Sequence, residues 1–138
     1  MWKLYAILSA VFAALTAIFA KIGIKDVNSN LATAIRTIVI LLITWGIVLC
    51  GDHIKDVKTL SGHTWLFLIL SGLATGCSWL FYFKAIQMGD VSKVAPIDKL
   101  SVVITMILSF ILFKEEASPR VILGGACIAL GSILIIMK

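Results

Sequence analysis

Five long apolar runs alternate with short polar segments along the chain. The runs cover residues 4–20, 31–50, 64–83, 94–113 and 120–137. A helix rises about 1.5 Å per residue, so runs of roughly 20 residues reach across the roughly 30 Å of a bilayer's hydrocarbon core. In an open chain, a helix is the structure that satisfies every backbone amide there. The pattern therefore predicts an all-α membrane protein with five transmembrane helices, joined by short loops into a single domain over residues 1–138.

The composition supports a lipid environment and argues against a soluble domain. The 138 residues are 61% hydrophobic and 14% charged, with a mean hydropathy of +1.10. Soluble domains carry about 25% charged residues, and a globule this small has too little interior to bury the excess apolar surface. The net charge is +5, but the basic residues stand singly at the ends of apolar runs, as membrane flanks do. We therefore expect the lipid bilayer, and not nucleic acid, as a partner.

No group of residues in the sequence has the pattern of a catalytic or metal site. Three cysteines, Cys50, Cys77 and Cys127, are scattered in or beside apolar runs, and His53 and His63 lie in a polar loop. The sequence contains no spacing typical of a nucleophile with its general base or of a set of metal ligands. We expect no enzyme activity, no cofactor and no metal.

The flanking charges give no clear orientation in the membrane. The side of the N-terminus carries five lysines or arginines and the opposite side also carries five, when Arg36 and Lys99 are left out as membrane-embedded. The positive-inside rule requires an asymmetry. One interpretation is that another signal fixes the orientation. The other is dual topology, in which two oppositely inserted copies form an antiparallel homodimer.

Polar residues recur at helical spacing in four of the five runs, which points them toward one face of each helix. In the third and fourth runs the candidates for solute contact on these faces are Thr75, Ser78, Ser101 and Thr105, with Trp79 beside the first two. Together the four faces predict a central cavity. The alternative is that the hydroxyls bond only to their own or a neighbouring helix.

Charged residues within the second and fourth runs are the sharpest functional signal. Arg36 lies about 7.5 Å beyond Leu31 and Asp98 about 6 Å beyond Val94, at similar depths from the same side. We therefore predict an Arg36–Asp98 ion pair, acting as a gate or as a structural link. Lys99 is a further candidate for contact with a charged solute. Pro96 predicts a break in the fourth helix, as in the broken helices of transporters.

Small residues mark two predicted helix-packing surfaces. Gly124 and Gly131 form a ridge on the fifth run with Cys127, and Gly72 and Gly76 form a patch on the third. Such residues let helices approach closely, within a subunit or across a dimer.

The second half of the chain resembles the EamA-type domain of the drug/metabolite transporter superfamily. The resemblance rests on residues 85–90 (AIQMGD), on 94–103 (VAPIDKLSVV), on Glu115, and on the glycines at 124, 125 and 131. Lys21 and Arg36 match the first half of the domain, so the resemblance covers essentially the whole chain. The chain departs from the family pattern in two places: Lys114 stands where a glycine is usual, and Val102-Val103 stands where Pro-Val is frequent.

The resemblance implies one half-transporter bundle of the single-domain, five-span bacterial or archaeal group. Most members carry two such halves in opposite orientations, so a lone half can supply both as an antiparallel homodimer. We expect a multi-pass protein of the plasma membrane, which is the inner membrane in bacteria that have two membranes. It would move a small metabolite or drug-like solute by alternating access. The alternatives are a non-transporting subunit of a hetero-oligomer and a translocase of a lipid-linked substrate.

Overall fold

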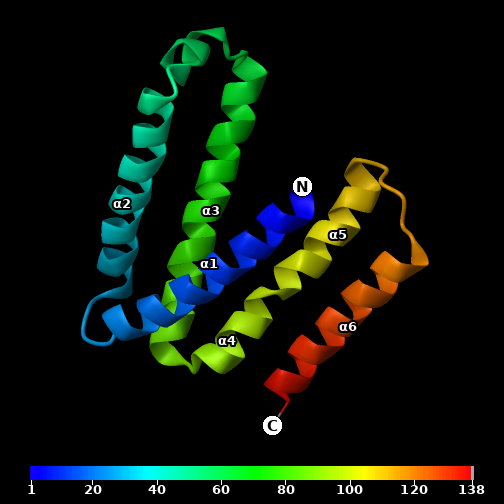
Figure 1. Ribbon diagram of the computed structural model, residues 1–138. Coiled ribbons are helices and arrows are strands. Elements are labelled where there is room, and N and C mark those ends of the chain that lie inside the picture. The colour runs from blue at the N-terminus through cyan, green and yellow to red at the C-terminus, as the bar shows by residue number, and fades with distance from the viewer. Residues whose placement is uncertain (138) are drawn as a thin grey trace. The chain divides into compact units, whose positions relative to one another are not determined.

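A computed structural model describes residues 1–137. Within this part of the chain all regular structure is helical (Figure 1). The α-helices are α1 (Trp2–Gly23), α2 (Ser29–Cys50), α3 (Gly62–Met88), α4 (Val91–Asp98), α5 (Leu100–Leu112) and α6 (Pro119–Ile136), and a 3₁₀ helix, η1 (His53–Thr59), joins α2 to α3.

The five predicted spans are confirmed as helices long and apolar enough to cross a membrane. Four of them are α1, α2, α3 and α6, and the fourth span is the broken helix Val91–Leu112, made of α4 and α5. The helices begin and end within a few residues of the apolar runs, except that α3 continues to Met88, five residues beyond the predicted end at 83.

Local sequence signals set several helix ends. The Asn28 side chain caps α2 by accepting hydrogen bonds from the backbone amides of Asn30 (2.9 Å) and Leu31 (3.4 Å). Ser118 caps α6 in the same way, with Pro119 at the first helical position, where the missing amide hydrogen costs nothing. Gly51 ends α2.

The contacts divide the chain into two compact units. The α2–α3 unit is Phe19–Gln87, and the α4–α6 unit combines Met1–Ile18 with the chain from Met88 onward. Each unit is described by itself below.

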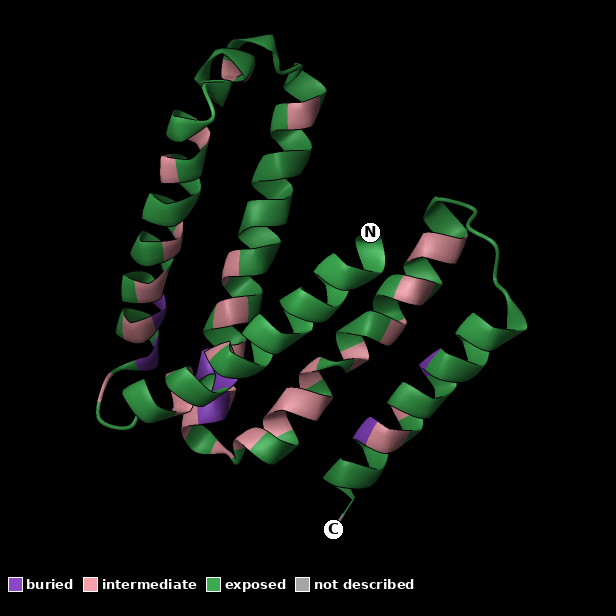
Figure 2. Cartoon of the chain, viewed as in Figure 1, coloured by how far each residue is buried: buried purple, intermediate pink, exposed green. Residues whose placement is uncertain are grey.

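The α2–α3 unit has a small core where α2 begins and α3 ends. Ile24, Phe83 and Ile86 are less than 2% exposed, and Ser29 and Thr33 are also buried there (Figure 2). The ends are linked by side chains: Lys21 Nζ donates to the Ile86 carbonyl (2.7 Å), and Gln87 Nε2 donates to the Val27 carbonyl (2.8 Å).

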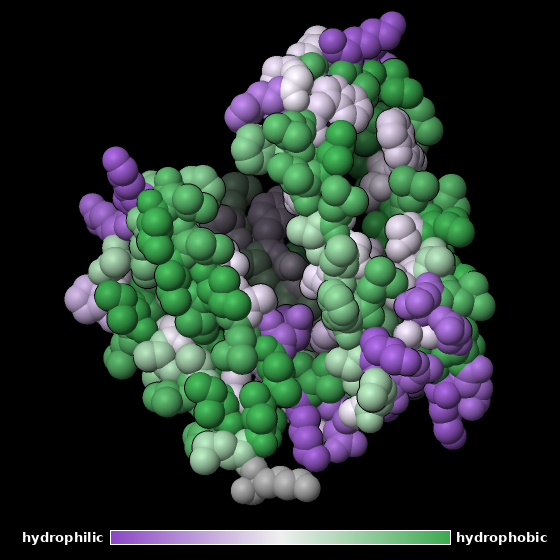
Figure 3. Space-filling view, turned by 180° about the vertical axis from the view of Figure 1, so that it is seen from behind, coloured by the Kyte–Doolittle hydropathy of each residue, from purple (hydrophilic) through white to green (hydrophobic). Residues whose placement is uncertain are grey.

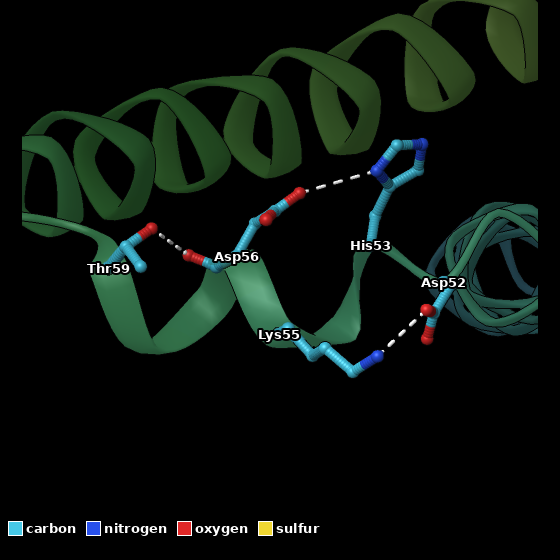
Figure 4. A network of polar contacts seen from close by, with 5 residues as sticks. All are labelled: Asp52, His53, Lys55, Asp56 and Thr59. Atoms are coloured by element: carbon cyan, nitrogen blue, oxygen red, sulfur yellow. Dashed lines mark hydrogen bonds and ion pairs between the residues drawn. The ribbon is translucent and has the colours of Figure 1, made fainter.

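The other end of this unit is the polar loop around η1. Lys55 Nζ lies 2.8 Å from Asp52 Oδ2, His53 Nδ1 lies 3.3 Å from Asp56 Oδ2, and Thr59 Oγ1 donates to the Asp56 carbonyl (Figure 4). These side chains are exposed, as expected for a loop that lies in water outside the bilayer.

In the α4–α6 unit, α6 packs against both α4 and α5. The close approach is at Gly125, where an added Cβ would lie 2.8 Å from Met106 Cε of α5. At the four glycines predicted to pack, Gly72, Gly76, Gly124 and Gly131, an added Cβ would meet no atom within 4 Å. Their packing role stays a prediction, whereas within the α4–α6 unit Gly125 makes the contact.

Most of the large apolar side chains on the helices are exposed. Figure 3 shows a face on which hydrophobic residues predominate over hydrophilic ones. In water such a surface would be unstable, so lipid is the medium that fits it.

Candidate functional site

The α2–α3 unit holds an arginine against two aromatic rings inside its spans. Arg36 lies two turns into α2, and its Cζ is 4.7 Å from the centroid of the Trp79 ring and 4.6 Å from that of the Phe83 ring. Trp79 and Phe83 are four residues apart on α3, so both project from the same face of that helix. The rings stabilise the cation through their π faces.

These contacts leave part of the guanidinium without a partner. Nη1 of Arg36 is buried and makes no hydrogen bond to any residue in 1–137. An unbonded buried donor, above all on a charged group, is unfavourable. The arginine is therefore the most unusual polar group in the described part of the chain.

The α4–α6 unit contains the second feature, the break in the fourth span. Pro96 has no amide hydrogen, so it cannot donate the helical bond to the Ser92 carbonyl. At Lys99 the helix tightens, because the Lys99 amide donates to the Pro96 carbonyl (3.1 Å) and the Val102 amide to the Lys99 carbonyl (3.0 Å). α4 ends at Asp98 and α5 begins at Leu100, so the interruption falls at Lys99, three residues after Pro96, which lies inside α4. That Pro96 causes it stays a prediction.

Two side chains bond to the carbonyl groups at the break. Ser132 Oγ on α6 donates to the Pro96 carbonyl (2.9 Å), and Ser101 Oγ donates to the Asp98 carbonyl (2.6 Å). Ser132 is 4% exposed, so its hydroxyl links α4 to α6 inside the unit.

Lys99 lies at the break with its ammonium group partly exposed. Its Nζ is 3.4 Å from Asp98 Oδ2, and its side chain is 54% exposed. It lines an open groove of about 420 Å³ between α4 and α6, together with Pro96, Cys127, Gly131 and Ser132 among others. The groove is otherwise apolar, so Lys99 supplies its positive charge.

Ser101 and Thr105 line a different open groove of about 430 Å³ along α5. Ser109, Phe113 and Glu115 also contribute to it. A carboxylate at the end of a line of hydroxyls gives this groove a polar side on an otherwise apolar helix.

Hydroxyls on the polar faces of the spans donate to backbone carbonyls of their own span. Thr75 donates to the Ser71 carbonyl at 2.9 Å. The same holds for Thr33, Thr37, Thr44, Ser101 and Ser109. Such bonds use the proton but leave the oxygen able to accept.

The candidate solute-contact residues thus lie in three places. Trp79 meets Arg36, and Thr75 lies one turn from Trp79 on α3, while Ser78 is exposed beside them. Lys99 lies in the groove along α6, and Ser101 and Thr105 lie in the groove along α5.

The predicted Arg36–Asp98 pair joins residues of the two units and stays a prediction. Within its own unit each residue has another neighbour: Arg36 has the two rings, and Asp98 has Lys99.

Three side chains were not identified by the sequence patterns. Phe83 is 1% exposed and contacts Arg36. Ser132 and Met106 were not singled out. A signal for Phe83 exists in the sequence, because it lies four residues after Trp79.

The helices and their exposed apolar surface define a multi-pass α-helical membrane protein. The profile of the EamA-like transporter family matches residues 1–137. The chain therefore belongs to this family of membrane transporters, as its motifs predicted.

Two bacterial relatives agree with this assignment. The chain is 48% identical over 134 residues to a Sinorhizobium sp. protein named uncharacterized transporter in cobO 3'region, covering 97% of this chain and 95% of that protein. It is 25% identical over 114 residues to the uncharacterized transporter YojE of Bacillus subtilis (strain 168), covering 80% of this chain but 38% of that longer protein. No solved structure matches the chain significantly.

Proposed function

We propose that this chain moves a small metabolite or drug-like solute across a bacterial plasma membrane by alternating access, as an antiparallel homodimer. The observation that carries the proposal is the break between α4 and α5, which leaves Asp98 and Lys99 within an apolar span. Transporters use such broken helices to present charges and backbone groups to solutes at membrane depth. The solute contacts proposed are Lys99, Trp79, Ser78, Thr75, Ser101 and Thr105.

The number of spans and the length of the Bacillus relative support the proposed dimer. Five spans place the two termini of one subunit on opposite sides, so a copy inserted the other way is the inverse of the first. The chain covers 38% of its Bacillus relative, which is consistent with a second half in that longer protein. In the dimer, the second copy takes the place of that half.

The Arg36–Asp98 pair is proposed as a gate that is closed without solute. Both residues are in spans, where an unpaired charge is unfavourable by about 2.5–3.5 kcal/mol at the bilayer centre. Pairing offsets part of this cost for each residue.

The direct test is transport by the purified protein in proteoliposomes, screened with small anionic, neutral and cationic solutes. Lys99→Gln removes the charge of the groove and should abolish or strongly reduce transport. Lys93→Gln is the matched control, because Lys93 lies on α4 but is exposed and bonded to Asp90 (3.0 Å). Equal activity of both variants would exclude Lys99 as a solute contact.

Orientation is tested separately with reporters fused to the C-terminus. An antiparallel dimer requires signal from both sides of the membrane. Signal from one side alone would contradict the antiparallel homodimer.

One observation favours a second candidate, the non-transporting subunit. The hydroxyls of Thr33, Thr37, Thr75 and Ser101 donate within their own spans, as expected if the polar helix faces serve structure only. Activity that is recovered only when a second protein is co-reconstituted would support this candidate over a self-sufficient transporter.

A further inference from the structure

The rings of Trp79 and Phe83 lie against the Arg36 guanidinium, but its Nη1 makes no hydrogen bond within residues 1–137. We propose that its Nη1 binds the oxyanion of the transported solute, a carboxylate or phosphate group, while Trp79 and Phe83 contact the adjoining apolar part. The inference rests on the proposed function and names the solute class for it.

Arg36 keeps its positive charge, because an arginine side chain stays protonated in proteins. Neither α2 nor α3 contains an aspartate or glutamate. The acidic residues of this unit are Asp26 in the α1–α2 loop, and Asp52 and Asp56 at the opposite end, where they bond to Lys55 and His53. No carboxylate on these two helices therefore neutralises the arginine.

The aromatic rings cannot take the place of that carboxylate. Their π faces attract the positive charge at 4.7 and 4.6 Å, but Nη1 still lacks a hydrogen-bond acceptor. The adjacent hydroxyls of Thr33 and Thr37 donate to the Ser29 and Thr33 carbonyls, and Nη1 makes no hydrogen bond to the oxygen of either. An acceptor from outside the unit is what the site requires.

An oxyanion fits this requirement better than a neutral acceptor. A guanidinium presents its N–H groups as a flat fork, which matches the two oxygens of a carboxylate or phosphate. Charge-assisted hydrogen bonds are roughly twice as strong as neutral ones, and more so away from water. The packed rings hold the fork in position, so little side-chain freedom is lost on binding.

Under the proposed gate, Asp98 occupies Arg36 in the absence of solute, and the solute's oxyanion replaces it. A cationic solute would be repelled by Arg36, and a neutral one would leave its charge unpaired.

The test uses the full chain in nanodiscs of phosphatidylcholine, with Trp79 as the sole tryptophan. Trp2→Phe, Trp45→Phe and Trp65→Phe remove the other three, which are exposed. Because Arg36 touches the Trp79 ring, an anion bound at Nη1 should change the Trp79 emission. Benzoate is titrated at neutral pH, where a carboxylic acid is ionised, and benzamide serves as its neutral isostere. Inorganic phosphate tests the second oxyanion.

We expect saturable changes with benzoate or phosphate and at least about tenfold weaker binding of benzamide. Equal responses to benzoate and benzamide, or no response to either anion, would overturn the proposal without any arginine variant being needed.

Arg36→Lys keeps the positive charge but loses the flat fork, and should weaken benzoate binding about tenfold or more. Arg120→Lys is the matched control, because Arg120 is the other arginine of the chain and is exposed at the start of α6. Unchanged binding in Arg36→Lys, or equal weakening in both, would contradict the assignment.

The headgroup of an anionic lipid also carries an oxyanion, so a further experiment distinguishes lipid from solute as the ligand of Arg36. Nanodiscs containing phosphatidylglycerol should weaken benzoate binding modestly at most. If Trp79 responds to phosphatidylglycerol but never to benzoate or phosphate in phosphatidylcholine, the occupant is lipid and the solute assignment is wrong.

The binding and transport experiments together show whether the oxyanion site or the proposed transport function is wrong. Anion binding without transport of any solute would refute the transporter as a self-sufficient unit and leave the oxyanion site standing. Transport of neutral or cationic solutes alone, with no anion response at Trp79, would refute the oxyanion site and leave transport standing.

Discussion

Ser132 on α6 donates its hydroxyl proton to the backbone carbonyl of Pro96 on α4, across a distance of 2.9 Å. The bond joins residues 36 positions apart in the sequence at the point where proline disrupts the helical ladder. It shows how the break in the fourth span is stabilised by a neighbouring helix.

Ser132→Ala should destabilise the protein by about 1 kcal/mol, because the partly buried Pro96 carbonyl loses one of its two donors. The measurement is thermal unfolding in detergent or lipid. Ser109→Ala is the matched control, since the Ser109 hydroxyl bonds the Met106 carbonyl of its own helix and its loss should change stability little. An equal loss in both variants would contradict a special role for the link between α4 and α6.

Lys114→Gly should stabilise the loop that follows α5. Lys114 has a φ of 53°, in the left-handed region that favours glycine, directly after the helix C-cap Phe113. Relieving this strain should raise the free energy of unfolding by about 0.5–1 kcal/mol. This is also the position at which the family usually has glycine.

Glu116→Gly provides the control for that change, because Glu116 is in the same loop but does not have a positive φ. There glycine should destabilise slightly or have no effect, since it only adds freedom to the unfolded chain. A gain at residue 116 as large as that at 114 would show that loop flexibility, and not the backbone conformation, is responsible.

Gly125→Leu should cost about 1–3 kcal/mol, because its side chain would overlap the packed end of Met106. Gly124→Leu should leave the stability of an isolated subunit nearly unchanged, since a Cβ there meets no atom within 4 Å. If the predicted dimer packs through the glycine ridge, Gly124→Leu should instead reduce crosslinking between subunits. Unfolding and crosslinking measured on the same two variants therefore separate contacts inside the subunit from contacts between subunits.

Lys21→Gln should destabilise the α2–α3 unit by about 1.5–3 kcal/mol, because the bond from the charged Nζ to the Ile86 carbonyl is lost. Lys25→Gln is the control, since Lys25 is exposed in the following loop. Thermal unfolding of both variants is the measurement, and a similar loss at residue 25 would indicate a general effect of charge.

A double-mutant cycle tests the predicted Arg36–Asp98 pair. Arg36→Gln and Asp98→Asn are made alone and together, and unfolding is measured without solute. A direct pair should give a coupling energy of about 0.5–3 kcal/mol. Additive effects would exclude the gate, and transport by Asp98→Asn with an unchanged pH dependence would also exclude a proton-carrying role for Asp98.

The helices were predictable from the sequence because the membrane imposes one length and one kind of surface on every span. Pro119 acted locally, so the start of α6 could also be placed, whereas the fourth span is interrupted at Lys99, three residues beyond Pro96. The extension of α3 to Met88 was missed because Lys84 ended the apolar run, although a lysine near a helix end can extend to the interface.

The contacts of the candidate site were less predictable, because they depend on how helices rotate about their axes. Depth along the spans suggested Asp98 for Arg36, but depth alone could not indicate the rings of Trp79 and Phe83. The small residues of α6 were recognised as a packing surface, yet the choice of Gly125 over Gly124 depends on where Met106 lies.

The unequal lengths of the helices have a consequence for the choice of membrane. With a rise of about 1.5 Å per residue, the 27 residues of α3 extend about 40 Å, whereas the 18 residues of α6 extend about 27 Å. A bilayer matched to α6 forces α3 to tilt or to project into the headgroup region, and a thicker bilayer stretches beyond the ends of α6. The acyl-chain length of the host lipid should therefore affect the two helices in opposite ways: shorter chains favour the span of α6, and longer chains favour that of α3.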